Sequence, residues 1–204
     1  MKEKLTISDS NKAELVRQLL VTGCLKLGQF TLKGGIETPY YVDLREATMS
    51  SSLFQTLVGN VERVVNSIVG INQSNLSSGD TEDSSVSIIG VPYGVVPLAA
   101  AVAFNRKLPY FPIRKEIKGY GNKTDSARYL NRRFVLIEDV MVSGLSIIET
   151  IQKLDETCVT DVIVVVDRES GGRANLKAAY PHINLHVILK ASELLESTNS
   201  TSKM

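Results

Sequence analysis

Two kinds of apolar pattern alternate along most of the chain. Short, mainly apolar runs without polar alternation predict strands, at 86–91, 110–114, 134–140, 162–167 and 185–189. Longer segments with apolar residues three or four positions apart predict helices, at 8–22, 53–69, 95–105, 146–156, 171–179 and 191–196. This regular alternation indicates an α/β domain whose mostly parallel sheet is flanked by helices on both faces.

The segment before this series has a different pattern. Residues 29–32 and 40–44 predict two short strands around the turn Lys33-Gly34-Gly35, which favours a small hairpin outside the main sheet. Residues 72–85 are rich in Ser, Asn, Asp and Gly and predict a flexible surface loop. A domain linker would have the same composition, but the flanking segments belong to one series. We therefore expect one domain over 1–204, with flexible tails at 1–7 and 197–204.

Composition and charge exclude several classes of protein. The chain has 204 residues, of which 43% are hydrophobic, and its net charge is +1. Such a balance provides no overall field for nucleic acid or an anionic membrane, so an anion site must be local. No apolar run is long enough to span a membrane, and 1–15 lacks a secretion signal. We expect a cytoplasmic protein. Ser202-Lys203-Met204 resembles a weak peroxisomal address, but a disordered tail is the preferred interpretation.

The cysteines and histidines do not indicate a metal site. Cys24 and Cys158 are too few for a disulfide framework or a cysteine-rich zinc site, so two free thiols are expected. His182 and His186 have helical spacing, but Pro181 and the strand-like surroundings argue against a helical metal pair.

The stretch 134–149 carries the strongest chemical signal. Glu138 and Asp139 follow a buried strand, at the edge where open α/β sheets bind ligands. The next loop holds a glycine and two serines, and Ser146 with Glu149 has the spacing of a capping box that would begin a helix. Carboxylates suit sugar hydroxyls or a metal ion, and the loop suits a phosphate. The pattern favours a site for a phosphorylated ribose, while a solvated acid pair is the alternative.

Two further loops could bind anions. Residues 90–98 follow a strand and place two prolines around a glycine, so backbone N–H groups can face a ligand. Residues 114–123 combine basic side chains with two glycines directly after a predicted strand. An ordinary solvated loop would also explain the second stretch.

The hairpin and Arg168 suggest recognition of a flat, acidic ligand. Lys33 lies beside two glycines, and Tyr40 and Tyr41 offer rings that could stack on a base. Arg168 follows a buried strand and could form a bidentate pair with a carboxylate. Interfacial tyrosines and a structural arginine are the plainer alternatives.

These motifs together resemble a known family. Glu138 to Ser146, EDVMVSGLS, resembles the phosphoribosyl-diphosphate motif of type I phosphoribosyltransferases. FTLKGGIETPYYVDLR, at 30–45, resembles the N-terminal segment of orotate phosphoribosyltransferase, in the form seen in the phosphoribosyltransferase domain of eukaryotic uridine-monophosphate synthase. The likeness extends over about 15–195, with five motifs in the family's order.

The resemblance implies a type I phosphoribosyltransferase fold with a small hood formed by the N-terminal hairpin. It implies transfer of phosphoribose from phosphoribosyl diphosphate to orotate, giving orotidine 5′-monophosphate and diphosphate in pyrimidine biosynthesis. Magnesium would bind mainly through the diphosphate. A homodimer is implied, with the Lys118 loop acting in the partner's site, and an orotidine-monophosphate decarboxylase is a further candidate partner.

The resemblance also assigns roles to residues. Lys118 and Asp139 would be catalytic, and Arg168 would bind orotate. The other implied substrate-binding residues are Lys33, Tyr41, Val42, Tyr93, Gly94, Arg114, Lys115, Tyr120, Glu138, Val140, Met141, Val142, Ser143, Gly144, Leu145 and Ser146.

Four departures from the family pattern leave two other functions open. Val142 and Leu145 stand where the family has hydroxyl residues, Gly119 replaces an aspartate, and a Glu-Gly pair after the basic loop is missing. A non-catalytic phosphoribosyl-diphosphate-binding protein is one alternative. A transferase for another base is the second, although the hairpin and Arg168 favour orotate.

Overall fold

A computed structural model describes residues 9–31, 35, 37–70, 86–113, 132–154 and 156–201. Its core is a four-stranded sheet in the order β3-β4-β5-β6, with every neighbouring pair parallel. The strands are β3 Val86–Gly90, β4 Arg133–Met141, β5 Val159–Asp167 and β6 Asn184–Lys190. β3 is buried along its whole length, and β5 is buried at every position except Thr160. This explains their uninterrupted apolar sequences, because helices cover both faces of a parallel sheet.

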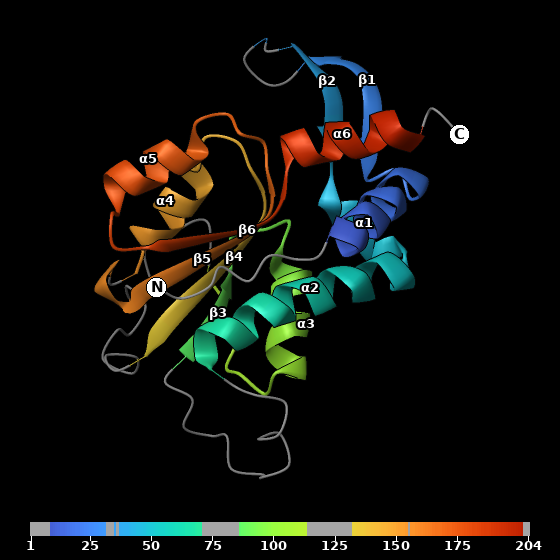
Figure 1. The fold of residues 1–204 in the computed structure, drawn as a ribbon. Helices are drawn as coiled ribbons and strands as arrows, with labels where there is room; N and C mark the ends of the chain where they lie inside the picture. Colours follow the sequence, from blue (N-terminus) through green and yellow to red (C-terminus); the bar gives the residue numbers. More distant parts are fainter. Residues whose placement is uncertain are drawn as a thin grey trace.

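The helices form two layers around the sheet (Figure 1). α2, Ser51–Val69, and α3, Val96–Asn105, contact each other and the sheet on one side. α4, Leu145–Ile151, and α5, Gly172–Ala179, pack together on the other side. The α/β architecture expected from the alternating pattern is confirmed.

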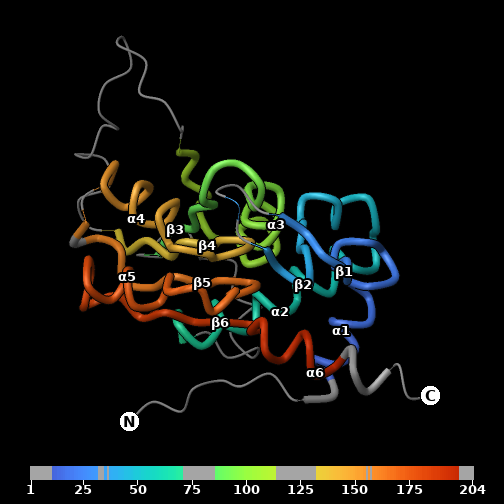
Figure 2. The backbone as a smooth tube through the Cα atoms, turned by 90° about the horizontal axis from the view of Figure 1, so that it is seen from above, coloured from blue at the N-terminus to red at the C-terminus, as the bar shows by residue number. Residues whose placement is uncertain are grey.

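A small hood lies at one end of the sheet. It contains the antiparallel hairpin of β1, Leu25–Thr31, and β2, Glu37–Val42, together with α1, Asp9–Val21, and α6, Ala191–Thr201. α6 begins directly after β6, so the hood is at the C-terminal edge of the sheet, as Figures 1 and 2 show. Lys12 Nζ donates to Glu193 Oε1 at 2.6 Å and ties α1 to α6. The 3-10 turn η1, Leu44–Met49, leads from the hairpin into α2, and a second 3-10 turn, η4, Glu156–Cys158, precedes β5.

Two sequence predictions are wrong in the described residues. The expected strand at 110–114 is reduced, over 110–113, to a single bridge between Tyr110 and Ile88. Pro112 explains this, because its nitrogen cannot donate to a sheet ladder. The expected capping box is also absent, since α4 begins at Leu145 after Gly144, with no side-chain cap. Gly144 adopts φ +75°, which turns the chain into the helix earlier than Ser146 would.

Several boundaries differ from those predicted. β1 and β2 begin earlier than expected, α4 ends at Ile151, and α6 continues past Ser197 to Thr201. The predicted loop at 72–85 and the predicted tail at 1–7 lie outside the described residues, as do 202–204, whereas 197–201 belong to α6.

Candidate active site

Glu138 and Asp139 lie near the C-terminal end of β4 and differ sharply in environment. Glu138 is only 6% exposed, and its Oε1 accepts the backbone N–H of Asp139 at 3.1 Å. Burial first, and the neighbouring Asp139 second, raise the pKa of Glu138 from 4.5 to about 9. Asp139 is half-buried, and its Oδ1 accepts the N–H of Val140 at 2.7 Å. Glu138 therefore keeps its proton at neutral pH.

The loop after β3 approaches this acid pair at Gly94. A Cβ atom at Gly94 would lie 2.4 Å from Asp139 Oδ2 and 3.3 Å from Arg45 Cγ, so no larger residue fits without movement. Tyr93, the residue before it, is 62% exposed. The structure thus brings the loop after β3 against Asp139 at Gly94, with the Tyr93 side chain exposed beside it.

Residues of α5 hold the loop between β4 and α4 through its backbone carbonyl groups. Gly172 N–H donates to the Val142 carbonyl at 3.0 Å, and Asn175 Nδ2 donates to the Ser143 carbonyl at 3.1 Å. A Cβ atom at Gly172 would lie 2.7 Å from Val142 O and 3.0 Å from Gly144 N. A Cβ at Gly144 would in turn lie 3.0 Å from Gly172 O. The two glycines therefore allow the loop and the start of α5 to pack backbone to backbone.

The other loop residues divide into exposed and buried groups. Val142, Ser143, Leu145 and Ser146 are exposed, so their side chains are open to a ligand. Met141 is buried and lies against Gly172, so its side chain faces the core. Its carbonyl oxygen instead accepts the N–H of Arg168 at 2.9 Å, which joins the ends of β4 and β5.

Arg168 is a buried cation without an acidic partner in the described part of the chain. It is 9% exposed, and its Nη2 donates to Thr38 Oγ1 at 2.8 Å. Its Nε donates to the Tyr40 hydroxyl at 3.3 Å, and its Cζ lies 4.6 Å from the centre of the Tyr40 ring. Neither partner is a carboxylate, so within the described residues the guanidinium charge is uncompensated at the junction of hood and sheet.

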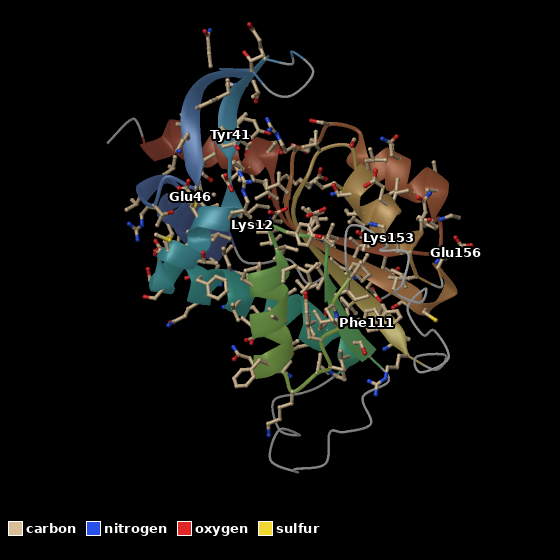
Figure 3. All side chains as sticks on the ribbon, turned by 180° about the vertical axis from the view of Figure 1, so that it is seen from behind. Lys12, Tyr41, Glu46, Phe111, Lys153 and Glu156 are labelled. Carbon is tan, nitrogen blue, oxygen red and sulfur yellow. The ribbon has the colours of Figure 1, made fainter. Side chains whose placement is uncertain are left out.

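The hairpin tyrosines have separate roles. Tyr40, expected to stack on a base, is buried and engaged by Arg168, so that expectation is wrong for this residue. Tyr41 is half-buried, and its ring centre lies 5.7 Å from that of Phe30. Figure 3 shows Tyr41 on the hairpin, near the 3-10 turn that carries Glu46. Val42 is buried and packs in the core.

The other basic candidates, and Tyr120, lie outside the described residues. They are Lys33 in the hairpin turn and Arg114, Lys115, Lys118 and Tyr120 in the basic loop.

The described residues offer a partial metal site at most. Within them, no three His, Cys, Asp or Glu side chains gather to hold an ion. Asp139 supplies oxygen donors, while Glu138 is protonated at neutral pH and a poor ligand. One carboxylate suits magnesium, which commonly takes its other ligands from phosphate and water. His186 Nε2 pairs with Asp161 Oδ1 at 2.8 Å. No described helix is long and apolar enough to cross a membrane.

Sequence reasoning missed the residues that hold the site in place. Thr38, Tyr40 and Val42 alternate buried with more exposed positions along β2, a period-2 signal that places Thr38 and Tyr40 on one face. Gly172 and Asn175 gave no such signal, because their partners are loop atoms about thirty residues earlier.

Comparison with known proteins identifies the family. No family model matches the chain. It is 34% identical to the orotate phosphoribosyltransferase of Methanosarcina acetivorans, covering 92% of this chain and 94% of that protein. It is 32% identical to uridine 5′-monophosphate synthase of Caenorhabditis elegans, covering 93% of this chain but only 36% of that longer protein.

Solved structures agree on the fold. The crystal structure of orotate phosphoribosyltransferase from Aeropyrum pernix superposes with a TM-score of 0.68 at 23% identity, covering 92% of this chain and 99% of that one. The four-stranded parallel sheet, the hood and the near full-length match to the archaeal protein lead to one assignment: the chain belongs to the orotate phosphoribosyltransferase family.

Proposed function

We propose that the protein transfers phosphoribose from phosphoribosyl diphosphate to orotate, giving orotidine 5′-monophosphate and diphosphate. The observation that carries this proposal is the buried guanidinium of Arg168 at the end of β5, which has no acidic partner among the described residues. The full-length match to an archaeal protein named orotate phosphoribosyltransferase supports it.

Arg168 is suited to the orotate carboxylate. A buried cation with only neutral partners is costly unless an anion joins it, and a carboxylate fits the planar donor fork of arginine. Thr38 and Tyr40 fix one side of the guanidinium, so its orientation is set before a ligand arrives. The base of the ligand would then lie between the hood and the C-terminal edge of the sheet.

The acid pair and the loop behind it would hold the ribose 5-phosphate. Asp139 can accept from a ribose hydroxyl, and protonated Glu138 can donate to one. Ser143, Ser146 and the backbone of the loop would contact the 5-phosphate. Gly172 and Asn175 keep that loop in place through its carbonyl groups, leaving its side chains open.

The negative charge of the diphosphate also needs cations from the protein. Lys33, Arg114, Lys115 and Lys118 are the proposed cations there, with Tyr93 and Gly94 presenting the loop after β3. When bound, magnesium would be held mainly by the diphosphate, with Asp139 as a candidate carboxylate ligand, and would supply further charge neutralisation.

The reaction is a substitution at ribose C1. The bond between C1 and the diphosphate oxygen breaks as the bond to orotate N1 forms, and diphosphate leaves with the electron pair. Orotate N1 reacts as an anion, so the protein needs no strong base. Its residues position both reactants and stabilise charge on the leaving group.

The test is a spectrophotometric assay of orotate consumption with phosphoribosyl diphosphate and magnesium. In Arg168→Ala, orotate binding should weaken by roughly 2–4 kcal/mol, while phosphoribosyl diphosphate binding changes little. Arg168→Lys keeps the charge without the fork and should recover part of the loss. Equal losses for both substrates would contradict the assignment of Arg168.

A non-catalytic phosphoribosyl-diphosphate-binding protein is the second candidate. Val142 and Leu145 favour it, because both are exposed in the loop and carry no hydroxyl. Binding of phosphoribosyl diphosphate without any orotate consumption would select this candidate over the enzyme.

We also propose a homodimer in which Lys118 acts in the partner's site and Asp139 in its own. Lys118→Ala and Asp139→Asn proteins, each nearly inactive, should recover about a quarter of all sites after subunit exchange. No recovery despite confirmed exchange would contradict action across subunits.

A functional partner and a cellular location can also be proposed. A decarboxylase acting on orotidine 5′-monophosphate is the proposed functional partner, and the longer uridine 5′-monophosphate synthase of Caenorhabditis elegans, which the chain matches over 36% of its length, is consistent with one. A cytoplasmic location is proposed because Cys24 and Cys158 are both free thiols.

A further inference from the structure

The Arg45 side chain approaches the loop after β3 at Gly94. It is the second residue of η1, directly beyond the hairpin, and its side chain is 65% exposed. Its Cγ lies 3.3 Å from the position that a Cβ of Gly94 would take, and Asp139 Oδ2 lies 2.4 Å from the same point. The Arg45 side chain and the Asp139 carboxylate therefore both approach Gly94, although they come from elements far apart in the sequence.

Asp43 fixes the direction of this arginine. Its Oδ1 accepts the backbone N–H of Arg45 at 3.0 Å and the Nε–H at 2.8 Å, and its Oδ2 accepts from Nη2. The Asp43 side chain is only 14% exposed, so the clamp is anchored in the fold. A guanidinium has five N–H donors, and this fork uses one edge. Nη1 has no hydrogen-bond partner within the described ranges, so it is available to a ligand.

The negative charge of Asp139 explains why a cation is needed beside the Gly94 loop. A diphosphate beside Asp139 would be repelled by the carboxylate unless a cation lies close to both. Arg168, the other described arginine of the site, is buried and directed toward the hairpin. Arg45 is the described cation that lies over the Gly94 loop, where the proposed function places the diphosphate.

We propose that Arg45 binds the diphosphate of phosphoribosyl diphosphate, that Asp43 holds it in position, and that Gly94 provides the space for its side chain. This inference rests on the proposed function, because it takes the diphosphate to lie at the loop after β3. Arg45 is thus a substrate-binding residue, and Asp43 is a positioning residue that acts through it.

Equilibrium binding by calorimetry tests the proposal, with phosphoribosyl diphosphate and ribose 5-phosphate as the two probes. In Arg45→Ala, affinity for phosphoribosyl diphosphate should fall about tenfold, as expected for one exposed charge-assisted contact. Affinity for ribose 5-phosphate, which lacks the diphosphate, should change less than about twofold. Arg45→Lys should recover part of the loss, and Asp43→Asn should give an intermediate loss for phosphoribosyl diphosphate alone.

Arg17→Ala is the matched control. Arg17 also forms a two-bond ion pair with a nearby acid, Glu14, and its side chain is 59% exposed, but it lies on α1, whereas the side-chain atoms nearest Gly94 belong to Asp139 and Arg45. The Arg17→Ala protein should bind both probes with the affinity of the wild type. If Arg17→Ala weakens phosphoribosyl diphosphate as much as Arg45→Ala, the effect is general charge and the proposal is wrong.

Other outcomes separate this proposal from the proposed function. An unchanged affinity in Arg45→Ala, or equal losses for both probes, overturns the role of Arg45 even if the wild type consumes orotate. A wild type that binds phosphoribosyl diphosphate but consumes no orotate removes the transferase function, while the two-probe comparison still decides the role of Arg45. A wild type that binds neither probe overturns both.

Discussion

The protonation state of Glu138 is the sharpest physical consequence of the fold. The side chain is buried beside Asp139, and its pKa is raised to about 9. Glu138→Gln keeps the shape and replaces the acid with a neutral amide, whose oxygen can still accept the Asp139 N–H. At neutral pH the substitution should therefore be tolerated, unlike the loss of a buried paired charge.

The magnitude follows from proton linkage. Between the pKa of the unfolded chain, near 4.5, and the folded value of about 9, the folded protein holds a proton on Glu138 that the unfolded chain has lost. Stability consequently falls as pH rises through this window, by up to about 1.4 kcal/mol per pH unit. From pH 6 to pH 8, the wild type should lose up to about 2.7 kcal/mol relative to Glu138→Gln.

Urea unfolding of both proteins at several values between pH 6 and pH 8 measures this difference directly. Subtracting the two free energies of unfolding cancels the titration of all other groups. Glu149→Gln, an exposed glutamate on α4, is the control and should follow the wild type. Parallel curves for the wild type and Glu138→Gln would refute the reasoning, because Glu138 would then be ionised in the free site.

Three other substitutions test the supports of the fold and the loop. His186→Ala should cost roughly 1–3 kcal/mol of folding stability at neutral pH, because it removes a hydrogen bond to the buried carboxylate of Asp161. Gly172→Ala should raise the KM for phosphoribosyl diphosphate and destabilise the fold by about 1–3 kcal/mol, since its Cβ meets loop backbone at 2.7 Å. Gly59→Ala is the control: it has open space around its Cβ position, so it should neither raise this KM nor destabilise the fold. Val142→Thr should lower the KM for phosphoribosyl diphosphate or orotate, because the added hydroxyl can form one hydrogen bond that strengthens binding by ~0.5–1.5 kcal/mol.

Each of these has its own check. Urea unfolding of His182→Ala, an exposed histidine, should match the wild type, and a loss equal to that of His186→Ala would point to a general effect. Steady-state kinetics with unchanged KM in Gly172→Ala would show that α5 does not position the loop. A raised KM in Val142→Thr would show that the loop is adapted to valine.

The amino-acid sequence alone determined the architecture and the neighbourhood of the site. Strands such as β5 are encoded by an unbroken Val/Ile run, and helices such as α2 by one apolar stripe, so local periodicity was enough to predict them. Parallel strands align their C-terminal ends, so the order of strands and helices was enough to place Glu138, Asp139 and Arg168 at one edge of the sheet. Local rules failed where a glycine or proline changed the backbone, as at Gly144 and Pro112.

Only the tertiary structure decided how the site residues are held and charged. Thr38 meets Arg168 across 130 residues of sequence, and Gly172 fits against Gly144 because two loops pack backbone to backbone. The proton on Glu138 and the position of Arg45 over Gly94 depend in the same way on neighbours from other elements. Burial and contact between distant segments arise from packing, and a pattern that spans only a few neighbouring residues contains no information about them.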